Sequence, residues 1–267
     1  MTTHPHSLKS LLLVSALTVL ASASAYAADD PFVGTWKLNR SKNQFTRQVA
    51  EFKDLGGDRY LWVYNSSHPV EYLADGKEHP FTGGGTYSLS RESPDRHVRT
   101  QKRDGQVTSV SVWTLSDGGK QLKVESKGTR PDGSSYTAEE SWTRVGSGSG
   151  LAGKWELKES QSSSVVEWVI KPFGKDGLAF SAPGYKEHQE IKFDGKDYPD
   201  YGPEITPGTT SCAKRIDEHT IQVTDKLNGK VTSTHEVTVS QDGMTLTDTR
   251  HVPGQKQPGI QVFEKEM

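Results

Sequence analysis

The chain has 267 residues, of which 25% are charged, a formal net charge of −2 and a single cysteine, Cys212. Charges of both signs are interspersed, which argues against a nucleic-acid-binding protein and against the Lys/Arg clusters that bind anionic membrane surfaces. One cysteine excludes an internal disulfide, so stability has to come from packing. Cys212 precedes a strand-like run and is interpreted either as a reactive thiol or as a small buried side chain, and the buried position is the one we expect.

The N-terminal segment has the pattern of a secretory signal peptide. Lys9 supplies a positive charge, residues 11–20 form an apolar run, and Ala-Tyr-Ala at 25–27 supplies small residues for cleavage. We therefore expect cleavage near Ala27 and export to the periplasm or the extracellular space. No later stretch reaches the roughly 20 apolar residues of a spanning helix, so no membrane span is expected.

An internal repeat organises the rest of the chain. "GTWKL" at 34–38 returns as "GKWEL" at 153–157, and "ADGKEHP" at 74–80 returns as "FDGKDYP" at 193–199, both at a spacing of 119. "RDGQVTS" at 103–109 and "LNGKVTS" at 227–233 are 124 apart. Self-similarity at a nearly fixed spacing indicates a duplication. The predicted organisation is a signal peptide at 1–27, a first unit at 28–145, a flexible Gly/Ser linker at 146–150 and a second unit at 151–267.

Each copy reads as a series of β-strands. In "RYLWVY" at 59–64 the alternation places Tyr60, Trp62 and Tyr64 on one face of a strand. Asp-Gly or Asn-Gly pairs, such as 104–105 and 228–229, separate the runs and suit tight hairpin turns. Because closing the sheet removes its exposed edges, the fold class predicted is all-β, with two tandem antiparallel up-and-down β-barrels of about eight or nine strands each.

The Gly-x-Trp phrase at the start of each copy resembles the first strand of lipocalin-like (calycin) barrels. That resemblance implies a barrel floor plugged by the tryptophan, with a cationic side chain near the last strand packed across it. The residues that match in this sequence are Gly34, Trp36 and Arg144 in the first copy, and Gly153, Trp155 and Lys265 in the second. The chain is also similar to a loose group of exported bacterial proteins of undefined activity, through "GTWKLNRSK" at 34–42 and "DGKDYP" at 194–199.

Known catalytic motifs are absent from the sequence. It contains no HExxH, GxSxG or phosphate-binding glycine loop and no cysteine pair for zinc, and after residue 27 no two histidines are three or four residues apart, so we expect no metal and no cofactor. "EHQE" at 187–190 and "EYLADGKEH" at 71–79 place carboxylates near an imidazole, which suits either general acid–base catalysis or a polar loop. His79 falls on the repeat position of Tyr198, which argues against a shared histidine mechanism. In the repeated "DGKxxP" phrase, Lys77 and Lys196 either meet an anionic ligand or solvate a turn.

The aromatic residues are the best candidates for a binding site. If they face an unfilled barrel interior, they line an apolar pocket; otherwise they pack as core. The candidate ligand-binding residues are Trp62, Tyr64, Tyr87 and Trp113 in the first copy, and Trp168 and Phe180 in the second.

Three functional hypotheses follow from these observations. The first is an exported carrier that binds a small apolar ligand and is not an enzyme. The second is a structural or interaction protein of the cell envelope with filled barrels and an unknown protein partner. The third is an isomerase or hydrolase in a barrel mouth, which needs titratable groups from different strands within about 3 Å of one another.

Overall fold

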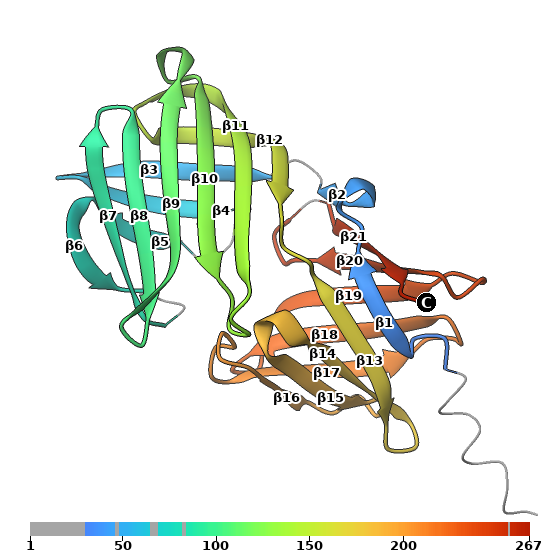
Figure 1. Cartoon of the computed structure of the whole chain (residues 1–267). Coiled ribbons are helices and arrows are strands. Elements are labelled where there is room, and N and C mark those ends of the chain that lie inside the picture. The colour runs from blue at the N-terminus through green and yellow to red at the C-terminus, as the bar shows by residue number, and fades with distance from the viewer. Residues whose placement is uncertain (1–29, 46–47, 65–68, 82–83, 256) are drawn as a thin grey trace, which may run out of the picture.

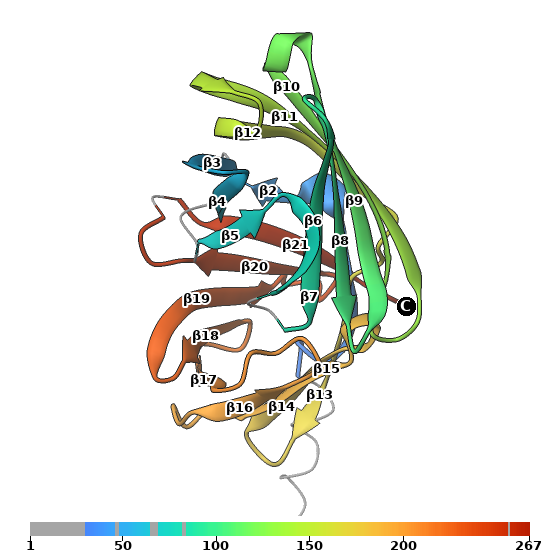
Figure 2. The ribbon, with the colours of Figure 1, turned by 90° about the vertical axis from the view of Figure 1, so that its left-hand side faces the viewer.

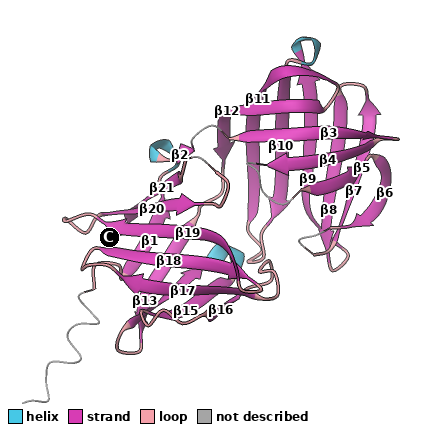
Figure 3. Cartoon of the chain, turned by 180° about the vertical axis from the view of Figure 1, so that it is seen from behind, coloured by secondary structure: helices cyan, strands magenta, loops and turns pink. Residues whose placement is uncertain are grey.

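The computed structural model describes residues 30–45, 48–64, 69–81, 84–255 and 257–267. Over these residues the chain forms two antiparallel β-barrels and no α-helix (Figures 1 and 3). No helix in this part of the chain has the length and hydropathy of a transmembrane segment. The expected signal peptide at 1–27 lies outside the described residues.

The first barrel, called barrel one, is a meander of ten consecutive strands. Each strand pairs with the next, except that β5 and β6 are not hydrogen-bonded to each other, and β12 returns to pair with β3. Barrel one is therefore nearly closed. Its strands are β3 (Val49–Gly56), β4 (Arg59–Tyr64), β5 (Val70–Leu73), β6 (Asp75–Pro80), β7 (Thr86–Ser93), β8 (Arg96–Arg103), β9 (Gln106–Ser116), β10 (Gln121–Thr129), β11 (Ser135–Ser149) and β12 (Ala152–Ser162).

The seam between β5 and β6 is bridged by a tyrosine. The Tyr87 hydroxyl on β7 accepts a hydrogen bond from the backbone N–H of Leu73 (3.0 Å) and donates one to the carbonyl of Glu71 (3.3 Å). These bonds use backbone groups of β5 that the interrupted ladder would otherwise leave without partners. Tyr87 thus helps to hold the seam shut.

The second barrel, called barrel two, is closed and also has ten strands. Nine are consecutive, and β1 (Gly34–Leu38) completes the ring by pairing with both β21 and β13. A short strand, β2 (Gln44–Phe45), adds to β21. The nine consecutive strands are β13 (Glu167–Phe173), β14 (Gly177–Ala182), β15 (Glu187–Lys192), β16 (Tyr198–Tyr201), β17 (Thr209–Arg215), β18 (Thr220–Leu227), β19 (Lys230–Val239), β20 (Thr245–His251) and β21 (Gly259–Lys265).

The two Gly-x-Trp strands are exchanged between the repeats. Strand β1, from the first repeat, lies between β13 and β21 of barrel two, and β12, from the second repeat, lies between β11 and β3 of barrel one (Figure 1). The barrels therefore do not coincide with the linear units 28–145 and 151–267. The chain passes from one barrel to the other twice, between β2 and β3 and between β12 and β13.

The Gly/Ser segment at 146–150 does not act as the predicted flexible linker. Residues 146–149 continue β11, and the register pairs Gly148 with Gly153 and Ser149 with Ala152, so the segment forms part of the β11–β12 hairpin inside barrel one. Gly148 is required by close packing, because a Cβ there would lie 2.2 Å from the Ala152 carbonyl oxygen. A pattern typical of a linker is here part of a tightly packed barrel wall.

The all-β fold class and the antiparallel barrels are confirmed, with ten strands per barrel where eight or nine were expected. The alternation in "RYLWVY" is confirmed as well, because Tyr60 is buried in the core of barrel one and Trp62 and Tyr64 pack against that core. The Asp104-Gly105 and Asn228-Gly229 turns have positive φ at both residues, as the hairpin prediction requires.

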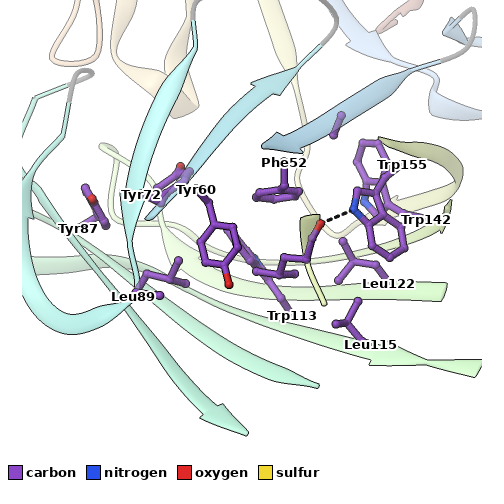
Figure 4. Packing of buried hydrophobic residues seen from close by; sticks show 13 residues of the cluster. Phe52, Tyr60, Tyr72, Tyr87, Leu89, Trp113, Leu115, Leu122, Trp142 and Trp155 are labelled. Atoms are coloured by element: carbon purple, nitrogen blue, oxygen red, sulfur yellow. Dashed lines mark hydrogen bonds between the residues drawn. The ribbon is translucent and has the colours of Figure 1, made fainter. Parts of the chain in front are cut away.

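Each exchanged tryptophan is completely buried and hydrogen-bonded. The indole N–H of Trp36 donates to the carbonyl of Phe32 (2.8 Å), and that of Trp155 donates to the carbonyl of Leu151 (2.9 Å; dashed line in Figure 4). The Gly-x-Trp motif, called the floor motif, is therefore built in the same way in both barrels, with the acceptor four residues before the tryptophan.

A cation lies over each of these indoles, but the predicted pairing is wrong. The Arg144 guanidinium lies 4.1 Å from the ring centroid of Trp155, and the Lys265 ammonium lies 5.0 Å from that of Trp36. The sequence prediction paired Trp36 with Arg144 and Trp155 with Lys265, within each linear repeat. The partners change because the strands are exchanged: Trp155 is in register with Arg144, and Trp36 with Lys265.

The glycine of each Gly-x-Trp phrase makes room for that cation. A Cβ on Gly153 would lie 2.4 Å from Nη1 of Arg144, and a Cβ on Gly34 would lie 2.6 Å from Cε of Lys265. Both glycines also have positive φ, +135° and +146°, which disfavours any side chain. The spacing of Gly-x-Trp thus reflects one packed unit of glycine, indole and cation.

The barrels also contact each other through arginines on two hairpins of barrel one (Figure 2 gives a side view). Arg130, after β10, donates from Nη1 to the carbonyl of Val165 (2.8 Å) and lies over the ring of Tyr185 (5.1 Å). Arg103, at the end of β8, pairs with Glu204 of barrel two (3.8 Å). The two crossings and these contacts join the barrels into a pair.

The exchange predicts which fragments fold alone. Residues 48–165 contain all ten strands of barrel one. Residues 28–145 lack β12, and they contain β1 without the strands β13 and β21 with which it pairs. We expect the 48–165 fragment to unfold cooperatively in urea, measured by tryptophan fluorescence, and the 28–145 fragment to show no cooperative transition. Cooperative unfolding of a monomeric 28–145 fragment alone would refute the exchanged topology.

Gly153→Ala is expected to destabilise barrel one by about 2–4 kcal/mol, because it adds a clash with Arg144 to the strain of a positive φ. The measurement is the free energy of unfolding from urea titration. Gly56→Ala is the matched control in the same barrel, since Gly56 also has positive φ (+79°) but a Cβ there would have no atom within 4 Å. Equal losses in the two variants would show that the packing against Arg144 is unimportant.

Candidate functional site: a cavity in each barrel

Each barrel contains a cavity of similar volume. The cavity of barrel one, the aromatic cavity, has a volume of about 270 Å³. The cavity of barrel two, the acidic cavity, has a volume of about 280 Å³. An engineered cavity of about 150 Å³ is known to bind benzene, so either space is large enough for a small organic molecule.

Rings from several strands form the wall of the aromatic cavity. Trp62 stacks on Tyr64 with 5.7 Å between ring centroids, and Phe52 lies 5.4 Å from Trp113 at a tilt of 59°. Figure 4 shows Phe52, Tyr72 and Trp113 within the barrel interior, with Trp155 of the floor on one side. A wall of this kind provides a large apolar surface at a small cost in side-chain entropy.

The aromatic cavity has one cationic and one acidic side chain in its wall. Arg99, on β8, lies over the rings of Tyr72 (5.6 Å) and Phe81 (5.5 Å), and its Nη2 donates to Oε1 of Gln101 (2.6 Å). Its Nε is buried and has no hydrogen-bond partner among the described residues. This nitrogen has almost no accessible surface, so a molecule in the cavity would meet other atoms of the Arg99 side chain, which lines the wall.

The acidic side chain of the same cavity is Glu140, on β11. It accepts a hydrogen bond from the indole N–H of Trp142 (3.1 Å). Burial raises the pKa of Glu140, and the bond from Trp142 opposes this only in part. Burial also raises the pKa of the neighbouring Tyr64 to about 12, so this hydroxyl stays neutral at physiological pH.

The acidic cavity combines aromatic and carboxylate side chains. Trp168 stacks on Phe263 (4.4 Å between centroids), and Tyr201 stacks on His188 (4.9 Å). Trp168, Phe180 and Tyr201 contribute apolar surface to its wall. Three carboxylates come from three different strands: Glu187 on β15, Asp200 on β16 and Asp225 on β18. Its lining contains no lysine and no arginine among the described residues.

A histidine between two aspartates forms the inner part of this wall. Nε2 of His235 lies 3.0 Å from Oδ2 of Asp225, and Nδ1 lies 2.9 Å from Oδ1 of Asp248, which is almost fully buried. The Ser233 hydroxyl donates to Asp225 (2.7 Å). Burial lowers the pKa of His235, but hydrogen bonds to Asp225 and Asp248 outweigh burial and raise it to about 9. His235 is therefore protonated at neutral pH, and both ring nitrogens already have partners.

Asp200 and Glu187 have no such counter-ion. The buried hydroxyl of Ser211 lies between Asp200 (3.1 Å) and Asp225 (2.9 Å), and Gln189 donates to Asp200. Burial raises the pKa of Asp200 despite these bonds. Burial also raises the pKa of Glu187, and the charges of Glu204 and Asp200 add to the shift. This side of the cavity therefore has an excess of negative charge.

Five of the six predicted ligand-binding residues line a cavity. Trp62, Tyr64 and Trp113 line the aromatic cavity, and Trp168 and Phe180 line the acidic cavity. Tyr87 is buried near the first of these but lies in the seam described above rather than in the lining.

The cavity residues that the sequence analysis did not predict are polar or charged. "EHQE" drew attention to Glu187 and His188, which do line the acidic cavity. The residues that sequence reasoning did not identify are Arg99, Glu140, Asp200, Asp225, His235 and Asp248. All of them lie in ordinary polar strand patterns, and the repeat offers the only signal: at the spacing of 124, Val124 is replaced by Asp248 and Ser111 by His235.

The "DGKxxP" phrase has a structural role in both copies. Asp75 accepts from the N–H of Lys77 (2.9 Å) and bonds to the ring of His79 (2.8 Å). In the second copy, Asp194 accepts from the N–H of Lys196 (3.0 Å) and from the hydroxyl of Tyr198 (3.1 Å). His79 and Tyr198 therefore play equivalent roles, because each forms a hydrogen bond with the aspartate that begins the turn.

The other surface features are weaker candidates for a ligand site than the two cavities. A surface depression of about 670 Å³ adjoins the aromatic cavity and shares Ser126 and Ala138 with it, but its lining has no aromatic residue among those described. Cys212 is a free thiol and is partly exposed rather than buried as expected. In the part of the chain that the structure describes, no cluster of three or more His, Cys, Asp or Glu side chains is arranged to hold a metal ion.

No known protein-family model matches the chain, and no curated protein is detectably similar to it.

The charged state of His235 should be visible in the pH dependence of stability. Its pKa is about 9 in the folded protein and about 6.5 in an unfolded chain, so its stabilising effect is complete below pH 6.5 and is lost as the pH rises through 9. We expect a loss of about 2–3 kcal/mol in the free energy of unfolding between pH 6.5 and 9, absent in His235→Gln. The measurement is urea unfolding at several pH values.

His251→Gln is the control for this prediction, because His251 is exposed on the neighbouring strand β20. It should keep the pH dependence of the parent protein. A parent protein with constant stability from pH 6.5 to 9 would show that the Asp225–His235–Asp248 arrangement does not hold a proton.

Proposed function

We propose that this chain is a lipocalin-like binding protein, exported after removal of residues 1–27, that holds small, largely apolar molecules inside its barrels. The observation that carries the proposal is that both barrels keep an interior cavity of nearly equal volume, about 270 and 280 Å³, with aromatic side chains in each wall. Small-molecule sites typically combine apolar walls with a few placed polar groups, as both cavities do.

The envelope-protein hypothesis is less well supported, because it requires filled barrels. The large hydrophobic side chains that are exposed, such as Leu55, Val107, Val165 and Ile216, belong to different strands and loops of the two barrels. Single exposed apolar residues are usual on soluble proteins and need no partner to explain them.

The enzyme hypothesis has one observation in its favour, namely that titratable groups from β18, β19 and β20 meet within about 3 Å at His235. The same geometry limits the chemistry. His235 is protonated and bonded through both nitrogens, so it has no free nitrogen to act as a base. Ser233, the hydroxyl nearest to it, is completely buried and donates to Asp225. Binding is therefore the function that this geometry supports best.

Calorimetric titration with the neutral probe 3-phenylpropan-1-ol tests the proposal. We expect binding with a Kd at or below about 1 mM, which corresponds to about −4 kcal/mol. Ala138 lines the aromatic cavity and Ala182 the acidic one, so Ala138→Phe and Ala182→Phe should each fill one cavity, and the double variant should bind no probe.

Ser135→Phe is the matched control, because Ser135 is exposed at the start of the strand that carries Ala138. This variant should bind the probe like the parent protein. Native mass spectrometry of protein purified without detergent should also detect a bound small molecule. Absence of probe binding to the folded parent protein would refute the proposed function.

A further inference from the structure

The two cavities occupy related positions in a duplicated scaffold, but they differ in charge. The floor motif is kept in both barrels, with glycine, buried tryptophan and cation. The residues at corresponding interior positions of the two barrels differ. At the repeat spacing of 124, Arg99 corresponds to Val223, Ser111 to His235 and Val124 to Asp248. Since the same fold forms with either set, these charged groups are not required by the architecture.

In the aromatic cavity the unmatched charge is positive. Arg99 has no carboxylate within salt-bridge distance among the described residues, and its side-chain bond is to the neutral amide of Gln101. Its buried Nε lacks any acceptor there. Glu140, the carboxyl in the same wall, forms no salt bridge with Arg99 among the described residues, and burial raises its pKa, which favours its neutral form. Arg99 lines the cavity, its planar guanidinium has the geometry that binds a carboxylate, and the rings of Tyr72 and Phe81 lie against that plane.

In the acidic cavity the unmatched charge is negative. The protonated His235 is shared by Asp225 and Asp248, which leaves Asp200 and Glu187 without a cation among the described residues of the wall. The raised pKa values of these two carboxyls agree with a missing counter-ion. Trp168, Phe180 and Tyr201 stand in the same wall, and aromatic faces attract an ammonium group.

We propose that the two barrels select ligands of opposite charge: the aromatic cavity binds an organic carboxylate through Arg99, and the acidic cavity binds an organic amine through Asp200 and Glu187. This inference rests on the proposed function, since it assumes that both cavities take ligands. It adds the chemical class of each ligand and assigns each class to one barrel.

Three probes of nearly equal size separate the inference from its premise: 3-phenylpropionate, 3-phenylpropylamine and the neutral 3-phenylpropan-1-ol. Each is titrated by calorimetry into the full-length mature chain carrying one blocked cavity. With the acidic cavity filled by Ala182→Phe, we expect the carboxylate to bind at least tenfold more tightly than the alcohol. With the aromatic cavity filled by Ala138→Phe, we expect the same advantage for the amine.

Point variants assign the effect to single side chains. Arg99→Met should weaken binding of 3-phenylpropionate at least tenfold and leave 3-phenylpropylamine unchanged, and Asp200→Asn should do the reverse. Arg96→Met is the matched control on β8, because Arg96 is exposed and pairs with Glu92 outside the cavity. If either point variant fails to fold, the blocked-cavity comparison in the preceding titrations still decides the question.

The outcomes distinguish the two claims. Equal affinity for all three probes in both blocked proteins would overturn the charge selectivity while leaving the proposed binding function intact. A preference for the amine in the aromatic cavity, or for the carboxylate in the acidic cavity, would also overturn it. Failure of every probe to bind would overturn the binding function itself, and the inference with it.

Discussion

Closure of each barrel by a Gly-x-Trp strand is the interaction on which the rest of the structure depends. The buried indole donates to a carbonyl four residues earlier, and a cation passes over its face through the space that the glycine leaves open. The strands that carry Trp36 and Trp155 offer the same groups at the same spacing, and each one closes the barrel built mainly from the other repeat. Because the strands are exchanged, barrel two closes with a strand from the N-terminal end.

The same closing motif stands in two barrels whose interiors differ. Since this motif and the strand ladders are present in both barrels, the fold forms with either set of cavity-facing side chains. Barrel one has mainly rings there, with one arginine and one glutamate, whereas barrel two has rings together with carboxylates around a protonated histidine. The duplicated part of the sequence is therefore mainly the part that builds the barrel, and the divergent part is the part that faces the cavities.

Local patterns in the sequence predicted the fold class, the alternating faces and the floor residues, because these depend on neighbours along one strand. Tyr60, Trp62 and Tyr64 are an example, since a period of two places them on one face of the strand, and the structure shows that this face packs into the core. The exchange could not be predicted in this way, because both closing strands carry the same motif and nothing along either strand shows which barrel it joins. The charged cavity residues were also missed. Arg99 and Asp225 lie in polar strands, and only the three-dimensional arrangement shows that they face inward.

The acidic groups in and around the acidic cavity fall into two sets, one whose charges are compensated within the protein and one whose charges are not. Asp225, His235 and Asp248 satisfy one another, so their burial is compensated by hydrogen bonds and by opposite charge. Asp200 and Glu187 receive no such compensation, and their raised pKa values show that ionising them without a nearby cation is unfavourable. An ammonium group placed beside them would remove that penalty. Because the penalty is largest where water is excluded, a ligand whose apolar part covers Trp168 and Phe180 would gain most from the same contact.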